Sequence, residues 1–199
     1  MDSKILDLSK MDGIRSILVV RLKALGDIVL SLPVISALRR HFPRARICYL
    51  CWGVYAEALM GETGLDEVLE LPRNFTGQIS LIRKLRLQKI DLVIDLLSSP
   101  RSALITFLSG ARLRVGMNVG RHNWCYHYVL PRIVSRDGKR VKCYTLESNR
   151  GMLRMLNLDA AGLGLRIGFP AAGIENDWAD AYVEELGVDR TRLVGIVPG

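Results

Sequence analysis

Apolar positions along the chain fall into short runs and longer helical patterns that follow one another. Three apolar runs, residues 17–20, 46–52 and 91–96, predict buried strands. Alternation of polar and apolar side chains predicts another strand over residues 67–72, and residues 113–115 form a fifth short run. Apolar side chains at helical spacing predict helices over these stretches: residues 28–41, 55–60, 78–88, 100–110 and 144–157. We therefore expect an α/β fold, a Rossmann-like and mostly parallel sheet with helices on both faces.

Two proline positions sharpen the helix boundaries. Pro33 interrupts the first helical pattern, so that helix must kink there or begin there. Ser99 and Pro100 predict a helix start, with the serine as N-cap and the proline in the first helical position. Residues 116–142 are rich in Arg, His, Tyr and Trp without clear periodicity, and we expect a long loop there.

The pattern divides the chain into three parts. Residues 1–12 are expected to form a flexible N-terminal extension, and residues 13–170 one Rossmann-like domain. Residues 171–199 are expected to be a linker with the first helix and strand of a truncated second α/β domain. The helix of that part includes Tyr182 and ends at Gly187.

The stretch after the first strand carries the strongest candidate for chemistry. In an open α/β sheet, ligands bind beside the carboxyl ends of the strands, and Asp27 follows such an end. An aspartate at a helix entrance is a favoured N-cap, typically worth ~1 kcal/mol. The same position keeps a carboxylate ionised in a cleft, where it can accept a proton as a general base. Lys23 and Arg21 either hold an anionic group or are solvated charges at the rim.

Two common nucleotide-binding motifs are missing from this turn. A dinucleotide fingerprint needs three glycines after the first strand, but only Gly26 is present. The Gly-Lys-Ser/Thr ending of a P-loop is also absent. The sequence therefore argues against a nicotinamide dehydrogenase and a P-loop nucleotide hydrolase.

Charge and cysteine content limit the possible partners. The net charge of +8 fits an acidic partner, such as nucleic acid, anionic lipid or a phosphorylated substrate, and equally a basic surface kept for solubility. Cys48 and Cys51 are three apart on a predicted strand and point to opposite faces, so we expect buried thiols and no metal site. The chain lacks an apolar run of membrane-spanning length and the apolar centre of a signal peptide, which predicts a cytoplasmic protein.

Beyond this pattern, residues 17–39 resemble the opening of the lipopolysaccharide heptosyltransferases, glycosyltransferase family 9. The segment contains Leu25-Gly26-Asp27 followed by Leu32-Pro33. The resemblance continues through residues 41–47, 91–96, 101–104 and 110–116, and residues 194–199 look like the start of the family's C-terminal domain.

The resemblance implies a GT-B enzyme whose N-terminal domain holds the acceptor and whose C-terminal domain holds the nucleotide-sugar donor. Asp27 matches the family's proposed general base, which would deprotonate an acceptor hydroxyl as it attacks the anomeric carbon of ADP-heptose. The transfer would invert the anomeric configuration without a metal or other cofactor. Candidate substrate-binding residues are Lys23, Gly26, Asp95, Ser99 and Arg101. This chain alone is expected to be inactive, because the donor half of the cleft would be absent.

The implied acceptor is the anionic, lipid-linked saccharide of the lipopolysaccharide inner core. The enzyme would meet it at the cytoplasmic face of the inner membrane as a peripheral protein. Arg83, Lys84, Arg86 and the segment 121–142 are candidates for contacts with its acidic groups.

Two alternatives stay open. The chain could belong to an enzyme that transfers another nucleotide sugar. It could instead be a basic nucleic-acid-binding module, which needs aromatic side chains interleaved with cations. One cluster meets that need: Trp124, Tyr126 and Tyr128 with Arg121 and Arg132.

Overall fold

The structure is a computed structural model. It describes residues 6–8, 13–131, 133–136, 139–142, 145–158 and 181–187. The chain separates into two compact units, Met1–Gly168 and Phe169–Gly199, and almost every described residue lies in the first.

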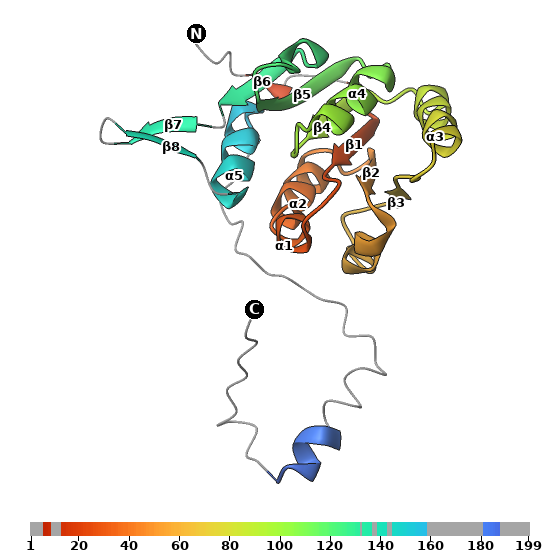
Figure 1. Cartoon of the computed structure of the whole chain (residues 1–199), viewed down its shortest axis with the longest axis vertical. Helices are drawn as coiled ribbons and strands as arrows, with labels where there is room; N and C mark the ends of the chain where they lie inside the picture. The colour runs from red at the N-terminus through yellow and green to blue at the C-terminus, as the bar shows by residue number, and fades with distance from the viewer. Residues whose placement is uncertain are drawn as a thin grey trace. The chain divides into compact units, whose positions relative to one another are not determined.

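The first unit is built on a six-stranded sheet in the order β3-β2-β1-β4-β5-β6 (Figure 1). All five strand pairings in it are parallel. The strands are β1 (Ser16–Val20), β2 (Arg46–Cys51), β3 (Glu67–Glu70), β4 (Leu92–Asp95), β5 (Leu113–Asn118) and β6 (Tyr128–Pro131). The predicted Rossmann-like α/β fold is confirmed.

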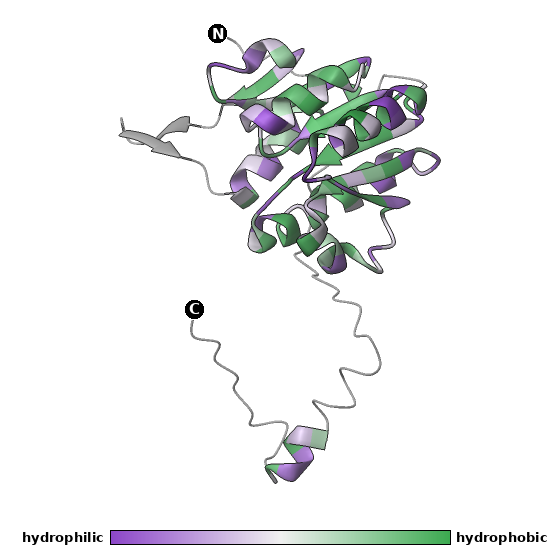
Figure 2. Cartoon of the chain, turned by 45° about the vertical axis from the view of Figure 1, so that its right-hand side comes forward, coloured by the Kyte–Doolittle hydropathy of each residue, from purple (hydrophilic) through white to green (hydrophobic). Residues whose placement is uncertain are grey.

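Helices cover both faces of this sheet. The helices are α1 (Leu25–Val29), α2 (Leu32–His41), α3 (Phe75–Leu87), α4 (Pro100–Leu108) and α5 (Thr145–Met155), with two 3₁₀ segments, η2 (Gly53–Leu59) and η3 (Asn123–Cys125). Side chains of α1, α2 and α5 share one core cluster with alternate residues of the central strands. Those of α3 and α4 share the other cluster with the remaining strand residues. The central strands are therefore apolar on both sides (Figure 2), as parallel strands buried on two faces must be.

Helix starts agree well with the local chemistry. A break separates α1 from α2, and Pro33 stands in the first turn of α2, one of the two outcomes predicted for it. At α4, Ser99 and Ser102 form a reciprocal capping box, and Pro100 is the first helical residue. The N-cap predicted at Ser99 is confirmed.

The expected long loop over residues 116–142 is wrong. β5 continues to Asn118, η3 follows, and β6 adds a sixth parallel strand. A separate antiparallel pair, β7 (Ile133–Arg136) and β8 (Lys139–Lys142), comes next (Figure 1). The connection from β5 to β6 contains a 3₁₀ turn in place of a crossover helix, so helical periodicity could not reveal it.

Other expectations concern the ends of the chain. Of the proposed extension over residues 1–12, the structure describes residues 6–8. Leu8 is fully buried in the core, and the Leu6 N–H donates to the Met155 carbonyl at 2.8 Å, so this part is held against α5. Residues 181–185 are helical, and Gly187 has the left-handed φ of 61° expected after a helix end. The strand predicted within residues 171–199 lies outside the described residues.

Candidate functional site

The loop after β1 lies at the topological switch point of the sheet. β1 pairs with β2 on one side and β4 on the other, and the strand order reverses direction between them. In open α/β sheets the crevice at this point is the usual ligand position. The loop from Arg21 into α1 therefore stands at the edge where a ligand is expected.

Asp27 lies in the first turn of α1, and it does not cap the helix. The N-cap is Ala24, with a φ of 70° and no side-chain cap hydrogen bond. The capping role considered for Asp27 is therefore wrong. Oδ2 of its carboxylate instead forms an ion pair with Arg21. Oδ1 accepts a hydrogen bond of 2.6 Å from the Thr145 hydroxyl. The Asp27 side chain is 28% exposed, so solvent or a ligand can reach it.

Arg21 is buried beneath this carboxylate. It leaves the end of β1, is 8% exposed as a residue, and its Nη1 donates to the Leu96 carbonyl at 2.6 Å. Leu96 follows β4, so Arg21 joins the loops on the two sides of the switch point. Arg21 is thus a paired, buried charge and not a solvated one. Its Nε is buried without a hydrogen-bond partner among the described residues.

The helix α5 contributes two further contacts that the sequence did not indicate. Thr145 is its first residue and holds Asp27 Oδ1. Asn149, one turn later, donates from Nδ2 to the Leu30 carbonyl at 2.8 Å, just after α1. Both residues are more than a hundred positions from the loop they fix, and no local motif marks them.

A buried pair also fixes the junction between α1 and α2. The Ser31 hydroxyl donates to the Ile28 carbonyl at 2.6 Å and lies 2.8 Å from the Tyr49 hydroxyl. Tyr49 is fully buried in β2, and burial raises the pKa of its phenol. This neutral pair ties the turn that carries Asp27 to the sheet beneath it.

The other predicted site residues take different positions. Lys23 and Gly26 are exposed in the same loop as Asp27. A Cβ built on Gly26 meets nothing within 4 Å, so the space beside it is open. Ser99 is occupied as the cap of α4, and Arg101 is exposed in the first turn of that helix.

Asp95 has no exposed surface. Its Oδ1 accepts from the backbone N–H groups of Leu97 and Ser98 at 2.9 and 2.7 Å, and its Oδ2 accepts from the Tyr126 hydroxyl at 2.8 Å. Burial raises its pKa, against the effect of these hydrogen bonds. We therefore assign Asp95 to holding the loop after β4, since direct contact with an acceptor would require the side chain to become exposed.

A pocket of about 540 Å³ opens beside the candidate site, where β2 and β3 end. It is lined by Trp52, Gly53, Val54, Glu70, Leu71, Pro72 and Arg73. The Trp52 N–H donates to the Leu22 carbonyl at 3.1 Å, which joins the pocket to the loop of Asp27. The Arg101 guanidinium lies 5.4 Å from the centre of the Trp52 ring. The structure thus brings Arg101 against Trp52, one of the residues that line this pocket.

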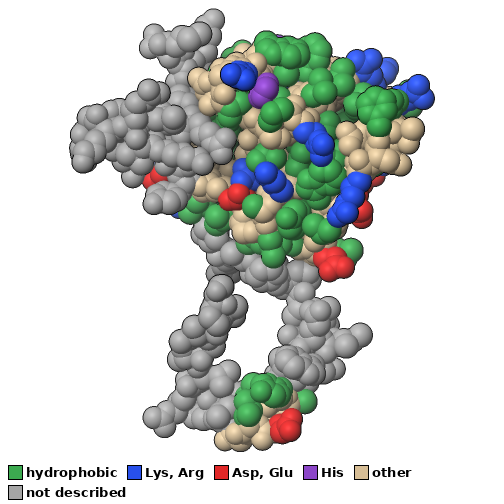
Figure 3. Space-filling view, in the orientation of Figure 1, with side chains coloured by type: hydrophobic (Ala, Val, Ile, Leu, Met, Phe, Trp, Pro, Cys, Tyr) green, Lys and Arg blue, Asp and Glu red, His purple; other side chains and the backbone are tan. Residues whose placement is uncertain are grey.

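The proposed cation and aromatic surfaces are partly occupied within the chain. On α3, Lys84 pairs with Glu67 at 2.7 Å and Arg86 donates to the Leu108 carbonyl at 2.7 Å. Tyr126 is 7% exposed, with its hydroxyl on Asp95, so it is not a free platform for a base. Arg132 lies outside the described residues. On the face shown in Figure 3, Lys and Arg side chains are scattered among apolar ones.

The described part of the chain contains neither a metal-binding cluster nor a membrane-spanning helix. No cluster of three or more His, Cys, Asp and Glu side chains there could hold a metal ion. No described helix combines the length and apolar character needed to cross a membrane.

Comparison with solved structures shows where this architecture recurs. A glycosyltransferase family 9 protein from Veillonella parvula DSM 2008 superposes with a TM-score of 0.69 at 20% identity, over 96% of this chain and 53% of that one. The chain shares the fold of the family 9 glycosyltransferases. The GT-B architecture expected from the sequence agrees with this likeness.

Two Escherichia coli enzymes give similar matches. Heptosyltransferase WaaC with ADP superposes with a TM-score of 0.61 at 17% identity, over 76% of this chain and 51% of that one. ADP-heptose lps heptosyltransferase II gives a TM-score of 0.57 at 17% identity, over 88% and 51%. The chain therefore spans about half the length of these structures.

Comparison at the level of sequence gave nothing further. No protein-family model matches the chain, and no curated protein does.

Proposed function

We propose that this chain is the acceptor-binding part of an inverting glycosyltransferase that moves heptose from ADP-heptose to a lipopolysaccharide inner-core acceptor. The observation that carries the proposal is a partly exposed carboxylate, Asp27, at the switch point of a sheet whose fold recurs in family 9 glycosyltransferases. WaaC has been solved with ADP and with ADP-2-deoxy-2-fluoro heptose, which supports a nucleotide sugar as the donor.

In the proposed reaction, Asp27 acts as general base. It takes the proton of an acceptor hydroxyl as that oxygen attacks the anomeric carbon, and the nucleoside diphosphate leaves from the opposite side. A positioned base of this kind typically contributes ~10²–10⁴-fold in rate. Arg21 and Thr145 each occupy one carboxylate oxygen, so the group is oriented before the acceptor arrives.

The loops around Asp27 would supply the acceptor contacts. Lys23 and Arg101 are exposed cations at this edge and can meet the acidic groups of the acceptor. Trp52 in the adjacent pocket has the Arg101 guanidinium 5.4 Å from its ring centre, and the two side chains together would contact a sugar ring. We propose no metal or other cofactor, a donor held by a second domain, and a peripheral place at the inner membrane.

The test is transfer by the full-length protein, with ADP-heptose and other nucleotide sugars offered to an inner-core acceptor. Turnover should require ADP-heptose and should fall by about 10²–10⁴-fold in Asp27→Asn, while Glu57→Gln, an exposed carboxylate on η2, should stay at the wild-type rate. Turnover with a different nucleotide sugar would replace the donor in this proposal. Near-wild-type turnover by Asp27→Asn would overturn the role of Asp27.

A further inference from the structure

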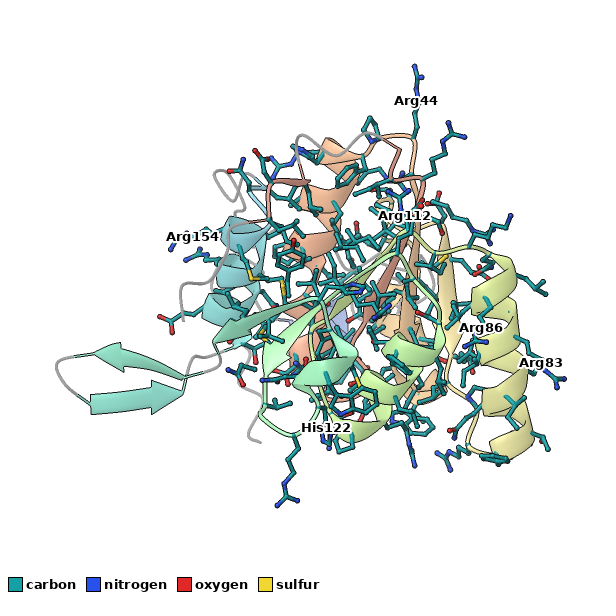
Figure 4. The ribbon with its side chains drawn as sticks, turned by 90° about the horizontal axis from the view of Figure 1, so that it is seen from above. Arg44, Arg83, Arg86, Arg112, His122 and Arg154 are labelled. Carbon is teal, nitrogen blue, oxygen red and sulfur yellow. The ribbon has the colours of Figure 1, made fainter. Side chains whose placement is uncertain are left out.

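The amino ends of the strands form a second edge, opposite to that of Asp27. A pocket of about 560 Å³ opens there, lined by Gly13, Arg15, Ser16, Arg46, Gln88, Lys89 and Asp91. These residues precede or begin β1, β2 and β4. Because a strand of five residues is about 16 Å long, this pocket is separate from the candidate site. In Figure 4, Arg44 and Arg112, which precede β2 and β5, lie at one end of the strands, and His122, after β5, lies at the other.

The pocket has an excess of positive charge. Arg15 and Lys89 are exposed, and the described residues offer no hydrogen bond or ion pair to either side chain. The third cation, Arg46, already donates to Glu67 at 2.7 Å. Two cations in the wall are therefore free to meet a ligand.

The single carboxylate of the pocket wall is already occupied. Asp91 Oδ2 accepts from the backbone N–H groups of Arg15 and Ser16 at 2.8 and 3.1 Å. Its Oδ1 accepts from Arg112 at 3.4 Å. Because Arg112 pairs with Asp91, and three cations line the wall against this one carboxylate, the pocket keeps its attraction for an anion.

Two features of the α3–β4 turn have no explanation within the chain. The Gln88 Oε1 atom is buried without a hydrogen-bond partner among the described residues, although buried acceptors are normally satisfied. Lys89 follows the helix end with a φ of 49°, a left-handed position that favours glycine. The turn thus keeps an unpaired acceptor and a cation at a position where glycine would be less strained.

We propose that this pocket binds a small molecule carrying a diphosphate or bisphosphate group. Arg15 and Lys89 would donate to the phosphate oxygens, as charged donors do. Gln88 lines the pocket, and its amide would turn toward the ligand so that a hydroxyl or amino group donates to Oε1. The volume exceeds that of a single phosphate, and two free cations match a ligand with several negative charges. The proposal is independent of the function proposed for the opposite edge.

The first test titrates this chain with inorganic pyrophosphate and follows the backbone amides by NMR. The amide signals of Gly13, Ser16 and Lys89 should shift, and that of Gly26 at the other edge should not.

Variants of the two cations test their part in binding. Arg15→Gln and Lys89→Gln should each raise Kd by about 10-fold, the loss of one charge-assisted hydrogen bond, and added salt should weaken binding. Arg150→Gln, at an exposed cation of α5 that belongs to neither proposed site, should leave Kd unchanged. No shift at millimolar pyrophosphate, or a Kd in Arg15→Gln and Lys89→Gln equal to that of the wild-type chain, would overturn the proposal.

Lys89→Gly separates binding from folding. Glycine accepts the left-handed φ, so the midpoint of urea unfolding should rise, while the affinity for pyrophosphate should fall as in Lys89→Gln. A rise in the midpoint with unchanged affinity would show that Lys89 does not bind the anion.

A matched pair of ligands tests Gln88. Hydroxyethane-1,1-bisphosphonate carries a hydroxyl that methylenebisphosphonate lacks, and it should bind several-fold more tightly to the wild-type chain. Gln88→Met should abolish that difference while keeping affinity for methylenebisphosphonate. Equal affinities in the wild-type chain would remove Gln88 from the proposed site.

Discussion

Asp91, at the amino edge of the sheet, accepts from two backbone N–H groups, whereas Asp27, at the carboxyl edge, accepts from the side chains of Arg21 and Thr145. Backbone donors belong to the folded main chain and cannot turn away without local unfolding. Side-chain donors can rotate and exchange for a ligand. A carboxylate held as Asp27 is held can therefore be oriented by the fold and still be available for chemistry.

The cations of the two edges differ in how far they are exposed to water. Arg21 is buried, and it links Asp27 to the Leu96 carbonyl across the switch point. Arg46 at the amino edge pairs with Glu67, but its side chain is 52% exposed. Exposed pairs contribute little because water screens them and competes for both partners. The two ion pairs should therefore respond very differently to the same type of substitution.

The largest effect on stability is expected from Arg21→Met. It removes the donor to Leu96 and leaves Asp27 without its cation, which should lower the free energy of unfolding by about 3 kcal/mol. Arg46→Met is the matched change at the amino edge and should cost less than about 1 kcal/mol. Urea unfolding of both variants measures the difference. Equal losses would show that burial of the Arg21 pair has no energetic importance.

A smaller effect is expected from Tyr126→Phe. The hydroxyl of Tyr126 is the donor to Asp95 Oδ2, so its removal leaves a buried carboxylate oxygen unpaired and should cost about 2 kcal/mol. The ring should stay in place, because it packs against Gly116, where a Cβ would lie only 2.6 Å from the ring. Tyr55→Phe is the control, since the Tyr55 hydroxyl has no hydrogen bond within the described structure. Wild-type stability of Tyr126→Phe would contradict the assignment of Asp95 to holding the loop.

The smallest expected effect is on how stability depends on pH, and it should have opposite sign at the two edges. The hydrogen bond from Lys84 lowers the pKa of Glu67 below its usual 4.5, so the stability contributed by Glu67 should be present at neutral pH and lost as pH falls through the lowered value. Burial raises the pKa of Asp95, so its contribution should be present at low pH and lost as pH rises through the raised value.

Unfolding of Glu67→Gln and Asp95→Asn across pH 3 to 7 measures these two contributions. Relative to the wild-type protein, Glu67→Gln should be less stable at pH 7 and lose that disadvantage toward pH 3. Asp95→Asn should gain relative stability as pH rises. The same slope for both variants would contradict the opposite shifts.

Much of the fold could be predicted from local patterns. β1 and β4 are buried on both faces, so their apolar runs are continuous, and the start of α4 is marked by Ser99 and Pro100. β6 could not be predicted, because it is a short edge strand that follows a 3₁₀ turn. The antiparallel strands β7 and β8 fall in the same stretch without periodicity.

The contacts of the candidate site could be predicted less well from the sequence. Asp27 stands out by its position after β1, but its local surroundings fit a helix cap equally well. Its actual partners are fixed by tertiary packing: Thr145 comes from α5, and Arg21 turns back from the end of β1. Contacts between residues far apart in sequence leave no spacing that a pattern can detect.

The hydrogen bond between Thr145 and Asp27 has a consequence for the order of folding. It joins positions 118 residues apart, and closing so large a loop costs more chain entropy than closing the nearer β1–β2 contacts. All six strands of the sheet also lie before residue 132, so they are synthesised before α5, and Asp27 Oδ1 receives the hydrogen bond of Thr145 only after that helix has been added. A growing chain would reach a nearly complete domain well before its candidate base was in position.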